Sequence, residues 1–155
     1  MSICVSENGV NPCIAFPFGH GLSYTTFKVS QPAIKRKANG YSILTKVTNT
    51  GKIKGAEVVQ VYAGVPSLEQ EVGDRTGKVI VEPPKRLVGY KKIFLAPNSS
   101  QNVTIDLDIS ATNHPLSVWS QNQKKWVVPN GLFTVYVCTS ASLSDLKSLN
   151  ISPKN

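Results

Sequence analysis

The sequence predicts an all-β antiparallel sandwich of about seven strands. Apolar and polar residues alternate at every second position, which is the pattern of strands that bury one face. Turn-forming residues separate the alternating stretches, and no stretch of ten or more residues has the pattern of an amphipathic helix. The chain has 155 residues, 41% of them hydrophobic, which suits one domain with a substantial core.

The first two thirds of the chain are expected to form four strands, at residues 22–29, 41–48, 57–63 and 87–95. These stretches are rich in the β-branched and aromatic residues that fit a pleated surface. A turn at Asn49-Thr50-Gly51 separates the second strand from the third, because Asn and Gly tolerate the left-handed backbone that ends a strand.

A long connection, residues 66–84, lies between the third and fourth expected strands and is several times longer than a usual hairpin loop. Its first half, 67–77, is charged and interrupted by Gly, which predicts mobility in the absence of a neighbouring domain and first cleavage near Arg75 or Lys78. Residues 79–81 are apolar and are expected to be better ordered against the sheet, and residues 78–81 can form an extra edge strand.

The last third is expected to form three strands, at residues 103–109, 116–119 and 131–137. In the first of these, Thr104, Asp106 and Asp108 face water, while the apolar residues between them face the core. Asn98 is expected in the left-handed conformation in the turn before it. Short strands at this spacing, without helices, are typical of immunoglobulin-like or fibronectin type III-like sandwiches.

The expected core consists of apolar residues from these strands, with at least one of Trp119 and Trp126 mostly buried. Both tryptophans are expected as large fillers of the core or between the sheets, and sugar stacking is the alternative role. The other expected core residues are Val47, Val59, Val61, Leu87, Val103, Ile105, Leu107, Phe133, Val135 and Val137.

The chain is basic, with 17 Lys and Arg against 9 Asp and Glu and a net charge of +8. Such a balance attracts acidic polymers, although the only run of three basic residues is Lys35-Arg36-Lys37. Nucleic-acid binding is not expected, since no basic face with interleaved aromatic residues is evident.

No apolar run approaches the ~20 residues that cross a bilayer, so no membrane partner is expected. No signal peptide is visible, which leaves the localisation of this chain open.

The three cysteines do not make a disulfide framework. Cys4 and Cys13 can pair across a short loop, and Cys138 is expected as a packed thiol within a strand. His20 and His114 are the only histidines and no C-x-x-C motif is present, so neither a metal site nor a cofactor is expected.

Three stretches are specific enough to indicate a family. FPFGHGLSYTTF at 16–27 resembles the segment that leads into the C-terminal domain of the β-glucosidases and β-xylosidases of glycoside hydrolase family 3. VTNTG at 47–51, followed by GAEVVQVY at 55–62, resembles a second signature of the same domain. PKRLVGY at 84–90 begins the third, which continues through LAP, LSVW and WVVPNG to residue 131. The ordered set covers roughly residues 14–146 and implies a fibronectin type III-like domain.

The signature residues are expected to have structural roles. Gly19 and Gly21 allow a tight backbone with positive φ or a close approach just before a strand. The full set is Phe18, Gly19, Gly21, Leu22, Tyr24, Asn49, Gly51, Gln60, Tyr62, Gly89, Trp119, Trp126 and Gly131.

The resemblance implies a longer parent protein in which a barrel and an α/β domain carry the catalysis. On this interpretation residues 1–15 are a linker or truncated lead, 16–146 the domain and 147–155 a C-terminal tail. The domain is expected to dock onto the catalytic domains and stabilise them; the alternative is adsorption to polysaccharide or another acidic or aromatic polymer through the basic surface. The parent is expected to be secreted, periplasmic or vacuolar.

No catalytic residue is expected in this chain. A retaining glycosidase needs two carboxyl groups about 5–5.5 Å apart in a sugar-sized pocket. Asp106 and Asp108 are outward strand positions, and no G-x-S-x-G motif is present. The remaining carboxylates considered, expected as solvated, lie in or beside the long connection and are Glu69, Glu71, Asp74 and Glu82.

Overall fold

A computed structural model describes residues 15–66, 83–142 and 147–153. These residues form ten strands and no helix. The strands are β1 (Phe27–Val29), β2 (Ala33–Lys37), β3 (Gly40–Asn49), β4 (Gly55–Gly64), β5 (Arg86–Leu95), β6 (Ser100–Asp108), β7 (Val118–Ser120), β8 (Lys125–Val127), β9 (Phe133–Cys138) and β10 (Lys147–Ile151). The all-β class predicted from the sequence is confirmed.

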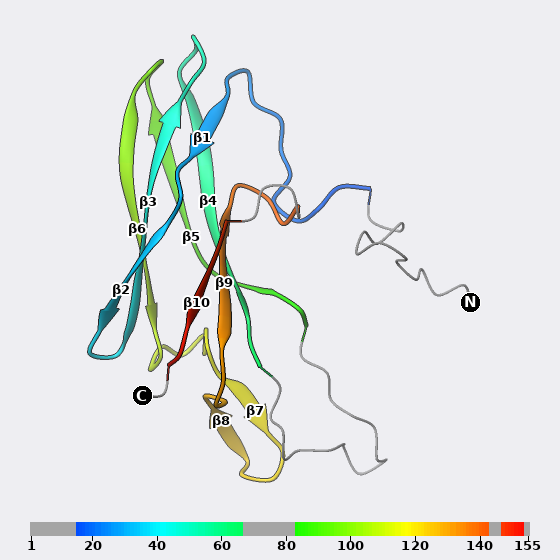
Figure 1. Ribbon diagram of the computed structural model, residues 1–155. Coiled ribbons are helices and arrows are strands. Elements are labelled where there is room, and N and C mark those ends of the chain that lie inside the picture. Colours follow the sequence, from blue (N-terminus) through cyan, green and yellow to red (C-terminus); the bar gives the residue numbers. More distant parts are fainter. Residues whose placement is uncertain (1–14, 67–82, 143–146, 154–155) are drawn as a thin grey trace.

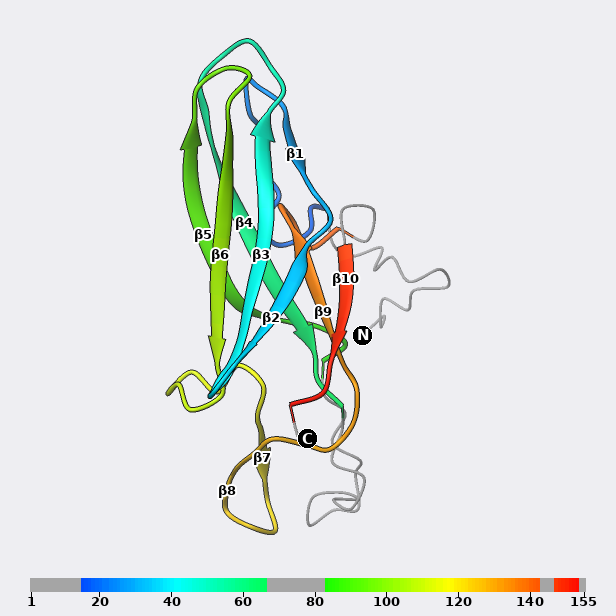
Figure 2. The ribbon, with the colours of Figure 1, turned by 60° about the vertical axis from the view of Figure 1, so that its left-hand side comes forward.

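Two four-stranded antiparallel sheets make up the body of the molecule (Figures 1 and 2). In the first sheet, β3 pairs with β6 along one edge and with β2 and then β1 along the other. In the second, the strand order is β10-β9-β4-β5. The hairpin β7–β8 forms a separate two-stranded unit, which lies at the lower end of the sandwich in Figure 1.

The core lies between the two sheets and follows the period-two pattern of the sequence. On β6, Val103, Ile105 and Leu107 are buried while the residues between them are exposed. On β9, Phe133, Val135 and Val137 are fully buried, as the alternation predicts. The thiol of Cys138 is also buried, which confirms its expected packing role.

Leu87 does not belong to the core, and the prediction for this residue is wrong. The pairing of β5 with β4 shifts between Val61 and Tyr62, where a β-bulge adds one residue, Val88, to β5. Because a bulge reverses the alternation of faces beyond it, Val88 turns inward and Leu87 becomes exposed.

Three strands were not predicted. β2 and β10 pair along outer edges of the two sheets, and β8 is the second strand of the small hairpin. The expected first strand also shortens, since β1 begins at Phe27 rather than at residue 22. The segment expected as a tail, 147–155, contributes β10, which pairs with β9 over five residues.

Beyond β10, the backbone carbonyl of Ser152 accepts a 2.6 Å hydrogen bond from the Tyr41 hydroxyl on β3, which ties the two sheets together.

Several expectations concern residues outside the described part of the chain. They are the pairing of Cys4 with Cys13, the order and cleavage of the connection 67–82 and its extra strand at 78–81, and the surroundings of Glu69, Glu71, Asp74 and Glu82.

Candidate functional site

The signature segment, residues 16–27, begins with a tight turn that lies against the second sheet. The His20 amide donates a 3.0 Å hydrogen bond to the Pro17 carbonyl, and Gly19 has a φ of 76°. A Cβ on Gly19 would collide with the side chain of Gln60, so both the dihedral and the space require glycine. The expectation for Gly19 is therefore confirmed. Gly21 has neither a positive φ nor a neighbouring atom within 4 Å, and the expectation for it is wrong.

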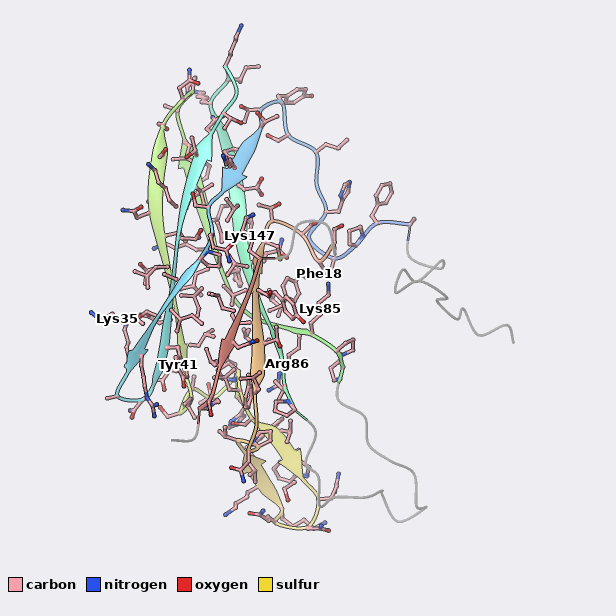
Figure 3. All side chains as sticks on the ribbon, viewed as in Figure 1. Phe18, Lys35, Tyr41, Lys85, Arg86 and Lys147 are labelled. Atoms are coloured by element: carbon pink, nitrogen blue, oxygen red, sulfur yellow. The ribbon has the colours of Figure 1, made fainter. Side chains whose placement is uncertain are left out.

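The turn is attached to the segment that follows β9. The Ala141 amide donates a 2.8 Å hydrogen bond to the Phe18 carbonyl, and the Lys85 ammonium donates to the Ala141 carbonyl at 2.5 Å. Figure 3 shows Phe18 and Lys85 close together at this junction. The turn is thus held by backbone contacts from a distant part of the chain.

Two polar signature residues of β4 are buried beneath the turn. The Gln60 amide nitrogen donates to the Thr139 carbonyl at 2.7 Å, and its amide oxygen accepts a 2.6 Å bond from the Tyr62 hydroxyl. Lys85 lies over the Tyr62 ring, 5.9 Å from its centroid. Burial raises the pKa of Tyr62 above its ordinary value of 10.0, which keeps the hydroxyl protonated as the donor to Gln60. The hydrogen-bonded Gln60 and Tyr62 side chains therefore form a fixed surface against which Gly19 of the signature turn packs.

Asn49 anchors the other end of the segment. Its side chain is fully buried and forms four hydrogen bonds. The amide oxygen accepts from the Thr25 hydroxyl at 2.6 Å and from the Gly51 amide at 3.0 Å. The amide nitrogen donates to the carbonyls of Ile53 at 2.8 Å and Leu95 at 3.2 Å. Asn49 is the last residue of β3 and β4 begins at Gly55, so the strand ends where the sequence predicts. Neither Asn49 nor Gly51 has a positive φ, so the left-handed backbone expected there is wrong.

The segment carries large apolar side chains that point to solvent although its backbone is held at both ends. Leu22 and Tyr24 are each 97% exposed, and Phe16 and Phe18 are also exposed. At one end of the segment, Gly19 lies against the side chain of Gln60 on β4. At the other end, Thr25 lies so close to Gly55, the first residue of β4, that a Cβ on Gly55 would meet it. This stretch of β4 has no partner from β9, which pairs only with residues Gln60–Gly64. Leu22 and Tyr24 therefore lie on the stretch between these two contacts with β4 and point to solvent.

A second exposed group is aromatic and lies on the hairpin β7–β8. Trp119 and Trp126 are directly paired across the hairpin, with ring centroids 5.7 Å apart and planes at 76°. The His114 ring stacks on Trp126 at 4.4 Å and 16°. Both tryptophans are more than 40% exposed, so the prediction that one of them is mostly buried in the core is wrong.

Two further signature glycines have visible steric roles. A Cβ on Gly89 would lie 2.7 Å from Cγ2 of Ile105 in the core, and Gly131 has a φ of 123° before β9. Asn98 has a φ of 56°, as predicted for its turn.

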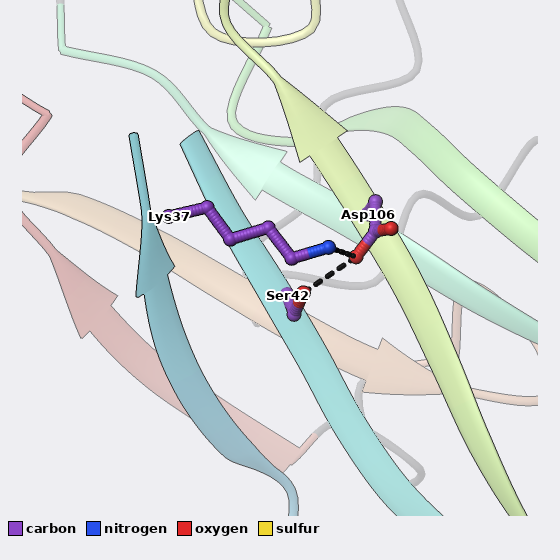
Figure 4. Close-up of polar contacts among 3 residues, drawn as sticks. All are labelled: Lys37, Ser42 and Asp106. Atoms are coloured by element: carbon purple, nitrogen blue, oxygen red, sulfur yellow. Dashed lines mark hydrogen bonds and ion pairs between the residues drawn. The ribbon is translucent and has the colours of Figure 1, made fainter. Parts of the chain in front are cut away.

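The carboxylates of β6 have partners within the first sheet. Lys37 forms a 2.9 Å ion pair with Asp106, which also accepts a 2.5 Å hydrogen bond from the Ser42 hydroxyl (Figure 4). The Ser42 hydroxyl and then Lys37 hold the pKa of Asp106 below its ordinary value. The hydroxyl and amide of Ser110 lower the pKa of Asp108 in the same way. Both carboxylates are therefore ionised partners of neighbouring strands and turns.

The described basic residues lie on several strands. Lys35-Arg36-Lys37 occupies β2, Lys91 and Lys92 lie on β5, and Lys125 lies on β8. Adsorption of an acidic polymer to them stays a prediction. Within the described ranges, no group of three or more potential metal ligands occurs, and no helix is suited to crossing a membrane.

Glu57 is a half-buried carboxylate on β4. It pairs with the core residue Ile93, so its side chain starts on the inner face of the sheet. Burial raises the pKa of Glu57 above its ordinary value of 4.5, and the hydrogen bond from the Val58 amide opposes that shift.

Replacing Glu57 by glutamine is expected to stabilise the protein at pH 7 and to change little below about pH 4. The folded state raises the pKa, so the stability that Glu57 contributes is complete below the unfolded pKa and is lost as the pH rises through the folded pKa. Urea denaturation at both pH values measures the difference. Asp108→Asn is the matched control of opposite sign, because the pKa of Asp108 is lowered. A Glu57→Gln effect that is independent of pH would contradict the assignment.

A model of the fibronectin type III-like domain matches residues 57–141, more than half of the chain. The probable beta-glucosidase L of Aspergillus fumigatus is 36% identical over 145 residues, which cover 81% of this chain and 18% of that protein. A beta-xylosidase of Formosa agariphila is 37% identical over 143 residues, covering 90% of this chain and 18% of its own length.

Solved structures agree. A beta-glucosidase from Kluyveromyces marxianus superimposes with a TM-score of 0.74 at 33% identity, over 92% of this chain and 15% of that one. A beta-glucosidase from Streptomyces venezuelae gives 0.72 at 32% identity, over 88% and 16%. The chain thus spans less than a fifth of the length of these relatives, in which the matching region is part of a much longer polypeptide. The chain belongs to the fibronectin type III-like domain family, in the form carried by family 3 β-glucosidases and β-xylosidases.

Proposed function

We propose that this chain is a non-catalytic module that docks, through residues 16–24, onto the catalytic part of a longer glycoside hydrolase and stabilises it. The observation that carries the proposal is the nearly complete exposure of Leu22 and Tyr24 on a segment that is held at both ends. A soluble surface gains nothing from a leucine and a tyrosine exposed two residues apart, whereas a docking surface buries them. The occupant is the remainder of the longer chain, because the matched relatives contain this domain as a small part of their length.

The supports of the segment explain how it keeps its shape before docking. The Phe18 carbonyl is held by Ala141 and the Thr25 hydroxyl by Asn49, so both ends of the exposed stretch are fixed to the sandwich. A fixed segment loses little conformational entropy when a partner covers it, which favours binding. The buried polar residues Asn49, Gln60 and Tyr62 hold the segment in this shape, and its exposed apolar side chains supply the contact with the partner.

A chimeric enzyme tests the proposal. In the probable beta-glucosidase L of Aspergillus fumigatus, the region that matches this chain is replaced by this chain. The double substitution Leu22→Ser and Tyr24→Ser is expected to lower the temperature of half-inactivation of the chimera by about 5 °C or more, because buried contact residues of this type carry most of the energy of an interface. The readout is residual hydrolysis of an aryl β-glucoside after heating.

The isolated 155-residue chain provides the first control, since its free energy of unfolding should hardly change with the same two exposed substitutions. Leu132→Ser is the matched variant, because Leu132 is an exposed leucine outside residues 16–24, directly before the first residue of β9. It should leave the chimera as stable as the unsubstituted one. Equal heat resistance of the chimera with and without the double substitution would refute docking through this segment.

A further inference from the structure

We infer that Trp119, supported by Trp126 and His114, is a stacking site for a pyranose ring of a glycan chain. The three rings form one exposed cluster on the hairpin β7–β8, and nothing in the docking role of residues 16–24 uses them. The inference therefore stands on its own observations and goes beyond the proposed function.

The cluster is built on a fixed base. Leu116, Val118 and Ser120 are all buried, so every second residue leading through β7 is packed beneath the rings. From β5, the Arg86 guanidinium donates to the carbonyls of His114 at 3.2 Å and Pro115 at 3.1 Å, and also to that of Ser117. The backbone that presents the rings is thereby clamped to the main sandwich. A rigid support is what a stacking site requires, because a mobile ring must be ordered again on each binding event.

The arrangement of the rings leaves an aromatic face available. His114 stacks flat on one face of Trp126, while Trp119 and Trp126 meet edge to face. In such a contact Trp126 covers at most one face of Trp119. Trp119 is 43% exposed, so a substantial part of its indole is open to solvent. His114 and Trp126 hold its orientation from one side.

The surroundings of the rings favour a sugar over an apolar ligand. The turn between β7 and β8 consists of exposed polar residues, and its shape is fixed by a 2.9 Å hydrogen bond from the Gln123 amide to the Ser120 hydroxyl. A pyranose ring has a C–H face that packs on an aromatic plane and a rim of hydroxyl groups that needs hydrogen-bond partners. The polar side chains that supply such partners are Gln121, Asn122, Gln123, Lys124 and Lys125.

The location of the cluster is compatible with simultaneous docking. Figure 1 shows β7–β8 at the lower end of the sandwich, whereas residues 15–26 run along its upper half. A partner seated on residues 16–24 therefore approaches a different part of the surface. A glycan bound at the hairpin would lie on the surface of this domain and would not enter a pocket.

Tryptophan fluorescence tests the inference directly, because Trp119 and Trp126 are the only two tryptophans of the chain. The complete chain is titrated with cellohexaose, with xylohexaose and with a glucuronic acid-bearing xylo-oligosaccharide, while calorimetry records the heat. At least one glycan is expected to give saturable heat together with reduced acrylamide quenching of the emission. Preference for the acidic glycan would assign a role to Lys124 and Lys125, and equal binding would assign the affinity to stacking alone.

Three variants locate the site. Trp119→Ala is expected to weaken calorimetric binding about tenfold or more, whereas Trp119→Phe retains a ring and should recover most of the affinity. Tyr90→Ala removes an exposed aromatic residue of β5 and should leave binding unchanged. Absence of saturable heat with all three glycans, or equal binding by Trp119→Ala, would overturn the inference. A loss of quenching seen only when the catalytic part of the relative is added would also overturn it, because the cluster would then be a protein contact.

Discussion

Replacing Phe133 by alanine is expected to lower the free energy of unfolding by about 3–5 kcal/mol, the usual cost of truncating a fully buried phenylalanine. Phe133 is the first residue of β9 and has no exposed surface. It pairs with Ile151 on β10, and its ring belongs to the core between the two sheets. Neither sheet can close around the missing ring without moving its strand pairing, so a cavity remains. Urea denaturation followed by circular dichroism measures the change.

Phe94→Ala is the matched control for this substitution. Phe94 lies on β5 but is largely exposed, with the Lys92 ammonium 5.3 Å from its ring centroid. Its loss should cost less than about 1 kcal/mol, since an exposed cation–π contact contributes no more than that. If Phe133→Ala shifted the unfolding midpoint as little as Phe94→Ala does, the inward orientation of β9 would be wrong.

The buried strands of the sandwich could be predicted from the sequence because each one records its environment locally. Residues 103–109 were expected as a strand and overlap β6 with the predicted face inward. Burial on one face imposes alternation on every second residue, and that alternation needs no knowledge of the partner strand. The same reasoning placed most of β3, β4, β5 and β9.

Two of the short edge strands, β2 and β10, could not be predicted because they bury little. β2 has the sequence AIKRK, and only Ile34 on it is not exposed. β10 has the sequence KSLNI, with Ile151 alone fully buried. Such sequences resemble loops, and they become strands because an adjacent strand supplies hydrogen-bond partners for their backbone.

The candidate sites were only partly predictable, since exposure depends on contacts distant in sequence. Leu22 and Tyr24 alternate with polar residues just as β-strand residues do, so the segment 22–29 was expected to be a strand. Trp119 and Trp126 were expected inside because large aromatic residues usually are. Sequence identified these residues as members of a signature, but it did not show that they face solvent.

Asn49 shows a further limit of sequence reasoning. The residues Asn-Thr-Gly after an apolar run predict a turn, and a turn role needs only local geometry. The actual role joins the local residues Gly51 and Ile53 to Thr25 and Leu95, which lie 24 and 46 residues away in the sequence. No local pattern encodes which of the many asparagines in a β protein will be buried in this way.

Replacing Asn49 by alanine is therefore expected to cost about 3 kcal/mol or more in the free energy of unfolding. The carbonyls of Ile53 and Leu95 lose their donor, and the Gly51 amide and Thr25 hydroxyl lose their acceptor. Each buried polar group left without a partner costs about 1–3 kcal/mol, although water that enters the space offsets part of it. Asn102→Ala is the control, because Asn102 is an exposed asparagine on β6 and should change stability by less than about 0.5 kcal/mol.

Asn49→Asp separates the loss of hydrogen bonds from the loss of volume. The new side chain has the same shape, but as a carboxylate it cannot donate to the carbonyls of Ile53 and Leu95 and faces their negative ends. Burial raises the pKa of such a carboxyl group, so the protonated form, which can donate one bond, is favoured in the folded state. The variant should accordingly lose stability as the pH rises from about 4 to 7, relative to the unsubstituted chain. If the variant were as stable as the unsubstituted chain at both pH values, shape, and not the donated hydrogen bonds, would be what Asn49 contributes.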